Sequence, residues 1–148
     1  MEVVDEHIPE ELFAKFTANM PEVCVELVVQ RDDQVLLAKR ANKPVQGEWF
    51  WPGGRLYKGE TLESAVDRIA AEELGIDVHL DRLLGVQSHF WDTSAVDEDI
   101  SRHTVNLVHL VNPDGRSPTI QLDSQHTAYD FVSEPDPSHH EIVKRYFD

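Results

Sequence analysis

The sequence predicts an α+β fold, an α/β/α sandwich in which a mixed β-sheet lies between helices. Three observations support this: several apolar, β-branched stretches, three segments with helical periodicity, and a glycine loop that leads into an acidic helix. A chain of 148 residues is long enough to bury a core, and it contains no internal repeat or linker rich in proline and glycine. We therefore expect a single domain over residues 1–148.

The first helix is expected over about residues 9–18. Leu12, Phe13 and Phe16 recur at helical spacing, and Glu10 and Glu11 stand in the first turn, where the helix dipole favours acidic side chains.

Two apolar stretches flank Asp32 and Asp33 and predict a β-hairpin, with strands over Val23–Gln30 and Val35–Arg40. Glu26 lies in the first strand and, depending on the length of the turn, faces Lys39 or Arg40. It is either a structural ion-pair partner or an acid that orients Arg40.

The acidic helix begins after Thr61. Its apolar side chains recur at helical spacing and form one stripe: Leu62, Ala65, Val66, Ile69 and Ala70. At about 100° per residue, Glu73 falls within this stripe. A carboxylate on the buried side of a helix is unfavourable unless it is paired or bound to a cation. Periodicity alone leaves two readings, such a buried carboxylate or a side chain near the helix end that reaches solvent.

Further strands are expected in the second half of the chain, over Leu83–Trp91, Thr104–Val111, Ile120–Leu122 and Tyr129–Ser133. His89 shares a strand face with Gln87 and Trp91, which favours a pocket position, whereas His109 alternates with apolar residues and is expected in the core. His126 is expected on a loop.

A final helix is expected over about 138–147, opened by a capping-box pattern. His139 and His140 are expected to be exposed in its first turn.

The 28 acidic and 13 basic residues give a formal net charge of −15, which repels nucleic acid polymers and anionic membranes. A phosphorylated substrate must therefore be attracted locally, by a metal and a few arginines. The dispersed acidic residues suggest a protein kept soluble at high salt, and so a halophilic source. No long apolar run or signal-peptide pattern occurs, so we expect a soluble, cytoplasmic protein. Cys24 is the one cysteine, which excludes a disulfide framework.

The spacing of Gly54, Glu60, Arg68 and Glu72–Ile76 resembles the Nudix box, G-x5-E-x7-R-E-U-x-E-E-x-G-U with U aliphatic, over residues 54–76. The first Glu of the R-E-U-x-E-E segment, which helps hold a catalytic metal in ordinary Nudix pyrophosphohydrolases, is replaced by Ile69. Over roughly residues 22–133 the chain resembles the GDP-mannose mannosyl hydrolase branch, which also lacks this Glu. The segments that carry this resemblance are Leu37–Arg55, Gly85–Phe90 and Gln125–His126.

This resemblance implies a Nudix-type sandwich and magnesium-dependent hydrolysis of a GDP-hexose to GDP and free sugar, by inverting attack of water at C1. GDP-mannose is the favoured substrate and GDP-glucose an alternative. His126 matches the branch's general base, and Arg40 and Arg55 match the arginines that neutralise the diphosphate. The expected substrate-binding residues are Glu26, His89, Trp91 and Thr104, where Thr104 replaces a tyrosine that the branch places near the phosphates.

The same resemblance implies one Mg²⁺ per subunit, with Mn²⁺ as a substitute, and a homodimer. The expected metal ligands are the Gly53 carbonyl, the Glu73 carboxylate and the Gln125 side-chain carbonyl, with Glu72 ranked below them. Arg68 is expected to hold the box together by pairing with Glu60 or Glu72.

Two other functions have to be tested against this one. A standard Nudix pyrophosphohydrolase would split a nucleoside diphosphate derivative between its phosphorus atoms, and Ile69 argues against it. A non-catalytic nucleotide-sensing Nudix domain would bind without turnover, and the retention of Arg55, Glu73 and His126 argues against that.

Overall fold

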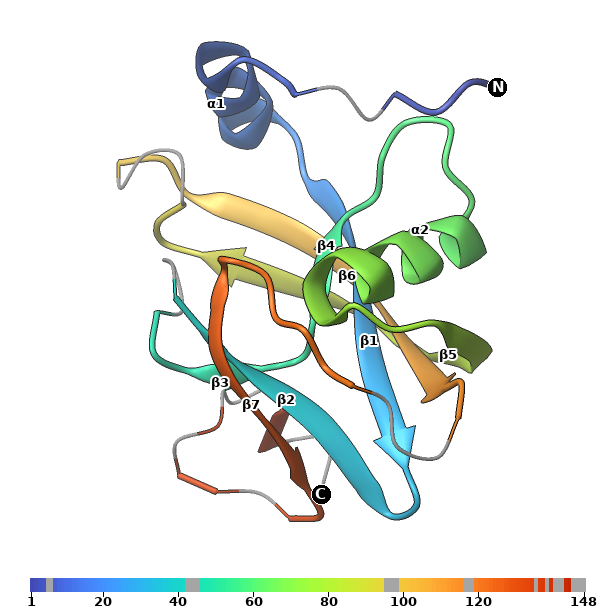
Figure 1. Cartoon of the computed structure of the whole chain (residues 1–148). Helices are drawn as coiled ribbons and strands as arrows, with labels where there is room; N and C mark the ends of the chain where they lie inside the picture. Colours follow the sequence, from blue (N-terminus) through green and yellow to red (C-terminus); the bar gives the residue numbers. More distant parts are fainter. Residues whose placement is uncertain are drawn as a thin grey trace.

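The computed structural model describes residues 1–4, 7–41, 46–94, 99–115, 119–134, 136–137, 139 and 143–144. Its elements, shown in Figure 1, are helix α1 (Glu10–Asn19), strands β1 (Glu22–Arg31), β2 (Gln34–Arg40), β3 (Trp49–Phe50) and β4 (Gly53–Arg55), helix α2 (Leu62–Ile69), the π-helical turn η1 (Ala70–Leu74), and strands β5 (Val78–Trp91), β6 (Arg102–Pro113) and β7 (His126–Val132). The predicted α+β fold is confirmed. No helix within the described ranges is both long and apolar enough to cross a membrane.

The sheet is mixed and is organised around β1. Its strands follow the order β3-β2-β1-β6-β5, with β4 also paired to β1 and β7 to β2. The β1–β6 pair is parallel, and the other recorded pairs are antiparallel. Helix α2 packs on one face of this sheet (Figure 1).

The predicted hairpin is present, but its two strands separate soon after the turn. They pair at Gln30↔Val35 and Arg31↔Gln34. Farther from the turn, β1 lies between β4 and β6, so Glu26 stands opposite Gly53 and Val108. The expectation that Glu26 faces Lys39 or Arg40 is therefore wrong, because it assumed that the hairpin stays paired along its whole length.

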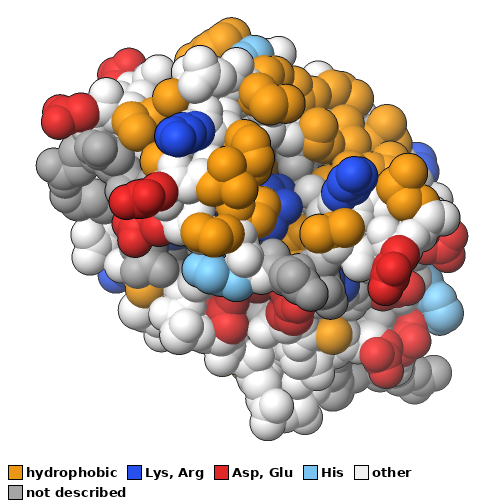
Figure 2. Space-filling view, turned by 90° about the horizontal axis from the view of Figure 1, so that it is seen from above, with side chains coloured by type: hydrophobic (Ala, Val, Ile, Leu, Met, Phe, Trp, Pro, Cys, Tyr) orange, Lys and Arg blue, Asp and Glu red, His pale blue; other side chains and the backbone are white. Residues whose placement is uncertain are grey.

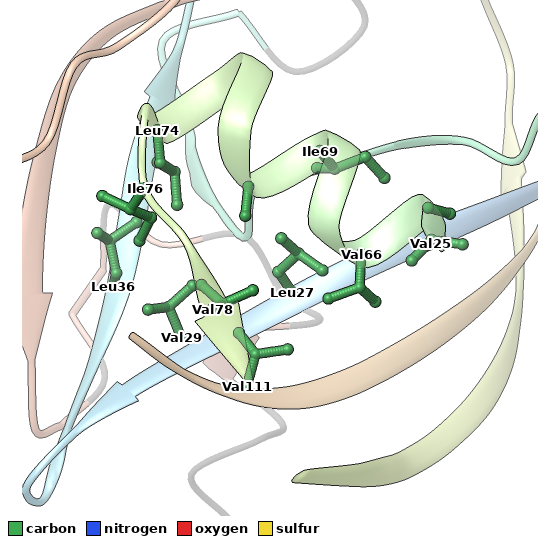
Figure 3. Close-up of a cluster of buried hydrophobic side chains, with 12 residues drawn as sticks. Val25, Leu27, Val29, Leu36, Val66, Ile69, Leu74, Ile76, Val78 and Val111 are labelled. Atoms are coloured by element: carbon green, nitrogen blue, oxygen red, sulfur yellow. The ribbon is translucent and has the colours of Figure 1, made fainter. Parts of the chain in front are cut away.

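Helix α2 presents its apolar stripe to the sheet. Thr61 caps the helix by accepting a hydrogen bond from the Ser64 backbone N–H at 3.1 Å. Figure 3 shows the stripe packed against β1, with Val66 and Ile69 of the helix in one cluster with Val25 and Leu27. Each such fully buried aliphatic side chain contributes about 1.5–3 kcal/mol relative to an exposed one, so this contact fixes the helix on the sheet. Leu62, in the first turn, stays partly exposed.

The segment Ile120–Leu122 is not a strand, contrary to expectation. It instead runs past the end of η1, where the Gln121 N–H donates to the Leu74 carbonyl at 2.8 Å and the Asp123 N–H donates to the Glu73 carbonyl at 3.3 Å. The last carbonyls of a helix lack hydrogen-bond donors within the helix, and the backbone N–H groups of this segment supply those donors. This contact also brings Asp123 beside Glu73.

The expected C-terminal helix lies mostly outside the described residues, although Val143 and Lys144 are helical. Val143 is fully buried in a second core cluster, formed with Val28, Val35, Leu37, Phe50, Trp51, Val108 and Leu110. His139 is buried, so its expected exposure is wrong. The Asp136 N–H donates to its Nδ1 at 3.1 Å, which stabilises the inward position. His140 lies outside the described residues.

His109 is buried, as the alternation with apolar residues predicts, and it stands between Leu27 of β1 and Leu83 of β5. Burial disfavours the charged imidazolium and lowers the pKa of His109 below its usual value. In the unfolded chain the imidazole takes up a proton more readily. The stability gained from the neutral, buried ring is therefore lost as the pH falls through the unfolded pKa of about 6.5.

We predict that His109→Gln lowers the free energy of unfolding more at pH 7.5 than at pH 5.5, because acidification weakens the unaltered protein at this position and not the variant. Urea unfolding at both pH values measures the difference. His7→Gln, at an exposed position, is the control and should change stability by less than about 0.5 kcal/mol. An equal loss at both pH values for His109→Gln would contradict the prediction.

Candidate active site

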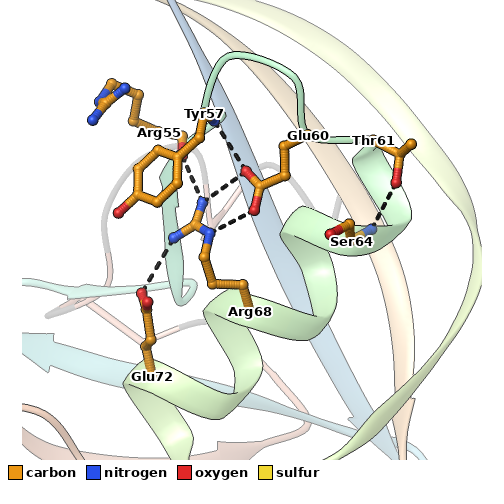
Figure 4. A network of polar contacts seen from close by, with 7 residues as sticks. All are labelled: Arg55, Tyr57, Glu60, Thr61, Ser64, Arg68 and Glu72. Carbon is orange, nitrogen blue, oxygen red and sulfur yellow. Dashed lines mark hydrogen bonds and ion pairs between the residues drawn. The ribbon is translucent and has the colours of Figure 1, made fainter. Parts of the chain in front are cut away.

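The glycine loop is tied to α2 through Arg68, whose guanidinium lies at the centre of a polar network (Figure 4). It donates to Glu60 at 2.7 and 3.1 Å, to the Arg55 carbonyl at 2.8 Å and to Glu72 at 3.2 Å. Glu60 also accepts from the Tyr57 N–H at 3.0 Å. Arg68 thus contacts both acids that the sequence offered as partners, and the contacts fix the glycine loop against the helix.

Gly53 is placed so that its backbone groups face away from β1. The Leu27 N–H donates to the Pro52 carbonyl and the Leu56 N–H donates to the Val23 carbonyl. Because hydrogen-bonded pairs alternate in an antiparallel ladder, Gly53 occupies a non-hydrogen-bonded position. A Cβ atom there would meet the Val25 carbonyl oxygen at 2.9 Å, which accounts for glycine at this site.

Glu73 is the buried carboxylate of the site. It is 7% exposed, so the reading in which it reaches solvent is wrong. Burial, together with the nearby charge of Asp123, raises the pKa of Glu73 to about 8, against the opposing effects of the Gly53 backbone and Arg40. The sequence predicted one continuous α-helix, but Glu73 lies in the π-helical turn η1. Such turns often occur at functional sites. Glu72, its neighbour, has a side chain that is 56% exposed and pairs with Arg68.

Two further side chains meet Glu73. His126 begins β7, opposite Arg40, and its side chain is only 1% exposed, so it is not a loop residue as expected. Its Nδ1 lies 2.7 Å from Asp123 Oδ1 and its Nε2 lies 3.6 Å from Glu73 Oε1. Sequence reasoning did not single out Asp123. The signal available was its position three residues before His126, in the segment that carries Gln125.

The cluster of Glu73, Asp123 and His126 fits a divalent cation. One potential ligand atom from each residue lies within 4.8 Å of the others. Glu73 Oε1 and His126 Nε2 are buried without a hydrogen-bond partner among the described residues, an unfavourable state that a cation would relieve. Carboxylate oxygen and imidazole nitrogen are both common ligands of divalent metals.

A cavity of about 340 Å³ opens beside this cluster. Its lining includes the three expected metal ligands and both expected phosphate-binding arginines, Gly53, Glu73, Gln125, Arg40 and Arg55, together with Asp123, Glu72, Arg68, Arg102, Phe13, Thr17, Glu22, Gly54, Tyr57 and Ser94. The structure therefore brings these expected residues to one place. His126 reaches the cavity through its contacts with Glu73 and Asp123.

A smaller cavity of about 70 Å³ adjoins the first and shares Arg40, Gly53, Gly54 and Arg102 with it. A chain of polar contacts runs along its wall. Trp91 Nε1 donates to Thr104 Oγ1 at 3.4 Å, the Thr104 hydroxyl donates to Asn106 Oδ1 at 2.6 Å, and Asn106 Nδ2 donates to Glu26 Oε1.

Glu26 ends this chain of contacts with its Oε2 atom unpartnered among the described residues. Burial raises the pKa of Glu26 to about 7, although the hydrogen bond from Asn106 opposes the shift. Glu26, Trp91 and Thr104, three of the expected substrate-binding residues, thus meet at the smaller cavity. His89 is not part of the lining, and its ring packs against Trp91 with centroids 3.8 Å apart.

The two expected arginines occupy different surroundings. Arg40 is largely buried, and burial lowers its pKa, although the charge of Glu73 opposes this. Its Nε has no partner in the described part of the chain. Arg55 instead lies over two aromatic rings, with its Cζ 4.6 Å from the Tyr57 centroid and 5.7 Å from the Phe13 centroid.

A cavity lined by carboxylates and arginines is typical of enzymes that bind a divalent cation together with a phosphorylated ligand. In agreement with this interpretation of the cavity, a family profile described as the NUDIX domain matches residues 19–147. The chain belongs to the Nudix family, whose hydrolases act on small-molecule nucleotide derivatives.

Among its relatives is the "Low-salt glycan biosynthesis protein Agl8" of Haloferax volcanii, which is 40% identical over 141 residues, covering 95% of this chain and 89% of that protein. An "ADP-ribose pyrophosphatase" of Methanocaldococcus jannaschii is 36% identical over 92 residues, 62% of this chain and 51% of that protein.

The solved structures show the same fold. A MutT NUDIX hydrolase from Burkholderia pseudomallei has a TM-score of 0.62 at 30% identity, over 86% of this chain and 95% of that one. A MutT protein from Methanosarcina mazei Go1 has a TM-score of 0.67 at 18% identity, over 87% and 92% of the two chains.

The Arg68 network gives a prediction about stability. Glu60→Gln should lower the free energy of unfolding by about 1.5–3 kcal/mol, because its side chain is 2% exposed and its loss weakens the charged hydrogen bonds that Arg68 makes to its main partner. The matched variant Glu72→Gln, at the exposed end of the same network, should lower it by less than about 1 kcal/mol. Urea unfolding measures both, and equal losses would contradict the assignment.

Proposed function

We propose that this Nudix hydrolase converts a GDP-hexose, preferably GDP-mannose, to GDP and free sugar by inverting attack of water at C1. The observation that carries the proposal is Ile69, which stands where the Nudix box has its first Glu and is fully buried in the core beneath α2. The helix therefore offers the cavity no carboxylate at that position. In the proposed step, the water oxygen forms a bond to C1, the bond from C1 to the diphosphate oxygen breaks, and the water proton passes to His126.

Mg²⁺ is the proposed cation, held by the Gly53 carbonyl, Glu73 and Gln125, all of which line the larger cavity. When bound, it would stabilise the negative charge that develops on the departing diphosphate. Asp123 lines the same cavity and offers a further carboxylate oxygen.

His126 is the proposed general base. Asp123 Oδ1 lies 2.7 Å from its Nδ1 and favours the tautomer that is protonated there. That tautomer leaves the lone pair on Nε2, the buried atom that has no hydrogen-bond partner among the described residues. Because the ligands proposed for Mg²⁺ are all oxygens, this lone pair stays free to accept a proton. A water entering beside Glu73 would find an acceptor oriented toward it.

The sugar is assigned to the smaller cavity. Glu26 Oε2 is unpartnered there and would accept a hydrogen bond from a sugar hydroxyl, while Trp91 and Thr104 complete the wall. His89 would act through Trp91, against which it packs. The name of the Haloferax volcanii relative, a glycan biosynthesis protein, supports a nucleotide sugar as the substrate class.

Attack at phosphorus is the second candidate, and one observation favours it. Asp123 brings a second carboxylate within reach of Glu73, in addition to the position where Ile69 replaces the first Glu of the box. The similarity to an ADP-ribose pyrophosphatase points in the same direction. The two reactions differ in the bond that breaks.

Hydrolysis of GDP-mannose with Mg²⁺ in heavy-oxygen water distinguishes them. We predict that mass spectrometry will find the label in mannose and none in GDP, because the attack is at carbon. Label in a phosphate product would establish attack at phosphorus and overturn the proposed reaction. Binding without any product would indicate a nucleotide sensor.

We further predict that His126→Gln lowers kcat by about 10² to 10⁴, the usual contribution of a general base. His79→Gln, at an exposed histidine of β5, is the matched control and should retain the activity of the unaltered protein. Steady-state kinetics on GDP-mannose measures both variants. Normal turnover by His126→Gln would remove His126 from this role.

The homodimer and the high-salt source remain proposals drawn from the sequence. Figure 2 shows hydrophobic side chains gathered on the face seen from above, with lysine and arginine side chains between them. Leu12 and Phe16 of α1, and Met20 directly after it, are among the exposed apolar residues. Exposed apolar patches are common where protein subunits meet.

A further inference from the structure

Arg102, the first residue of β6, lies where the two cavities meet. It lines both of them, together with Arg40, Gly53 and Gly54. Neither the Nudix box nor the wider resemblance gives this arginine a role. Its position nevertheless places a further guanidinium, besides that of Arg40, in the lining of both cavities.

The Arg102 side chain is held in a fixed orientation. Its Nε donates to Glu22 Oε2 at 3.1 Å, its Nη2 lies 3.0 Å from the same oxygen in an ion pair, and Nη2 donates to Cys24 Sγ at 3.5 Å. Glu22 is itself held, since its Oε1 accepts a hydrogen bond from the Thr17 hydroxyl of α1 at 3.0 Å. These contacts use one edge of the guanidinium. No described residue pairs with Nη1, the remaining nitrogen.

Arg40 is the second cation at this junction. Its side chain is partly buried, and its buried Nε lacks a partner among the described residues. Both arginines line both cavities. Burial lowers the pKa of Arg40, and the positive charge of Arg102 adds to this effect, although the charge of Glu73 opposes it. Two like charges in a poorly solvated site favour an anion between them.

We propose that Arg40 and Arg102 together bind the diphosphate of the substrate at the junction of the two cavities. This assignment rests on the proposed function for the class of substrate, a nucleoside diphosphate derivative. Planar guanidinium groups match the geometry of phosphate oxygens. With the diphosphate at the junction, the sugar enters the smaller cavity and the nucleoside occupies the larger one.

The surroundings of Arg55 and Thr104 support the assignment of Arg102, and not these two residues, as the partner of Arg40 in binding the diphosphate. Arg55 lies over aromatic rings and lines the larger cavity only. The Thr104 hydroxyl donates to Asn106 at 2.6 Å and accepts from Trp91 at 3.4 Å, so it is already engaged on the protein side. Arg102, two residues earlier in β6, is the cation of this strand that faces both cavities.

Arg102→Met tests the proposal through binding of GDP in the presence of Mg²⁺, measured by isothermal titration calorimetry. Loss of a hydrogen-bonded charge at the diphosphate should raise the Kd about 10- to 100-fold. Arg82→Met removes the same charge from an exposed arginine of β5 outside both cavities and should leave the Kd unchanged. Guanosine, which has no phosphate, should bind all of these proteins equally.

A second variant separates binding from folding. Arg102→Met leaves the buried Glu22 carboxylate unpaired, so Glu22→Gln/Arg102→Met removes both charges and should fold with the same weak GDP binding. Arg102→Lys should recover part of the affinity and its salt dependence, which a purely structural role would not require. Unchanged GDP affinity in the folded double variant would overturn the proposal.

The outcome does not depend on which bond the enzyme breaks, because GDP contains the diphosphate in either reaction. ADP and inorganic pyrophosphate, titrated in the same way, should show the same loss in the Arg102 variants. Failure of the unaltered protein to bind any of these three ligands would overturn the diphosphate site. Weak GDP binding by the variants, combined with label in phosphate, would support the site and reject the proposed function.

Discussion

The arrangement of the site depends on the burial of the Glu73 carboxylate. Removal of a carboxylate from water is unfavourable unless a cation or hydrogen-bond donors replace the lost hydration. Around Glu73 the chain places the Gly53 backbone, Arg40 and His126, yet Oε1 keeps no hydrogen-bond partner among the described residues. The negative charge of the adjacent Asp123 further disfavours the ionised form of Glu73. The cluster is therefore incomplete on its own and suited to a cation, as is expected of a Nudix hydrolase.

The position of Glu73 in turn depends on β1 and on the Arg68 network. Apolar residues of β1 on one face, Val25 and Leu27 among them, pack beneath α2, whereas Glu26 on the opposite face reaches the smaller cavity. One strand therefore supports both the helix that carries the candidate metal ligand and the wall of the second cavity. Arg68 fixes the glycine loop to the same helix, which holds Gly53 in a fixed position relative to Glu73. This coupling explains how a helix with a replaced Glu still positions the carboxylate of the candidate metal cluster.

The sequence predicted the elements with strong periodicity, namely α1, α2, the hairpin and the strands β5, β6 and β7, because local pattern determines them. The prediction from sequence was wrong, or missed a residue, where tertiary contacts determine the local structure. Residues Ile120–Leu122 have the composition of a strand, but the free carbonyls at the end of η1 bind this segment instead. His126 looked like a loop residue, because nothing in the local sequence shows that it pairs with Arg40. Asp123 was missed for the same reason, since its significance comes from its contact with a histidine three residues away and a glutamate fifty residues earlier.

Thr104 stands where the GDP-mannose mannosyl hydrolase branch, which the sequence resembles, has a tyrosine near the phosphates, and this difference need not weaken the proposed phosphate binding. A threonine side chain is too short to reach across the cavity, and here its hydroxyl is part of the chain of contacts that ends at Glu26. Through these hydrogen bonds Thr104 orients Asn106, and Asn106 in turn fixes Glu26, the acceptor proposed for a sugar hydroxyl. The phosphate contact can then pass to Arg102 on the same strand, held by Glu22 at the junction of the cavities. Under the proposed function, Arg102 would supply a phosphate contact that the short Thr104 side chain does not reach, and different residues of β6 would serve sugar recognition and diphosphate binding.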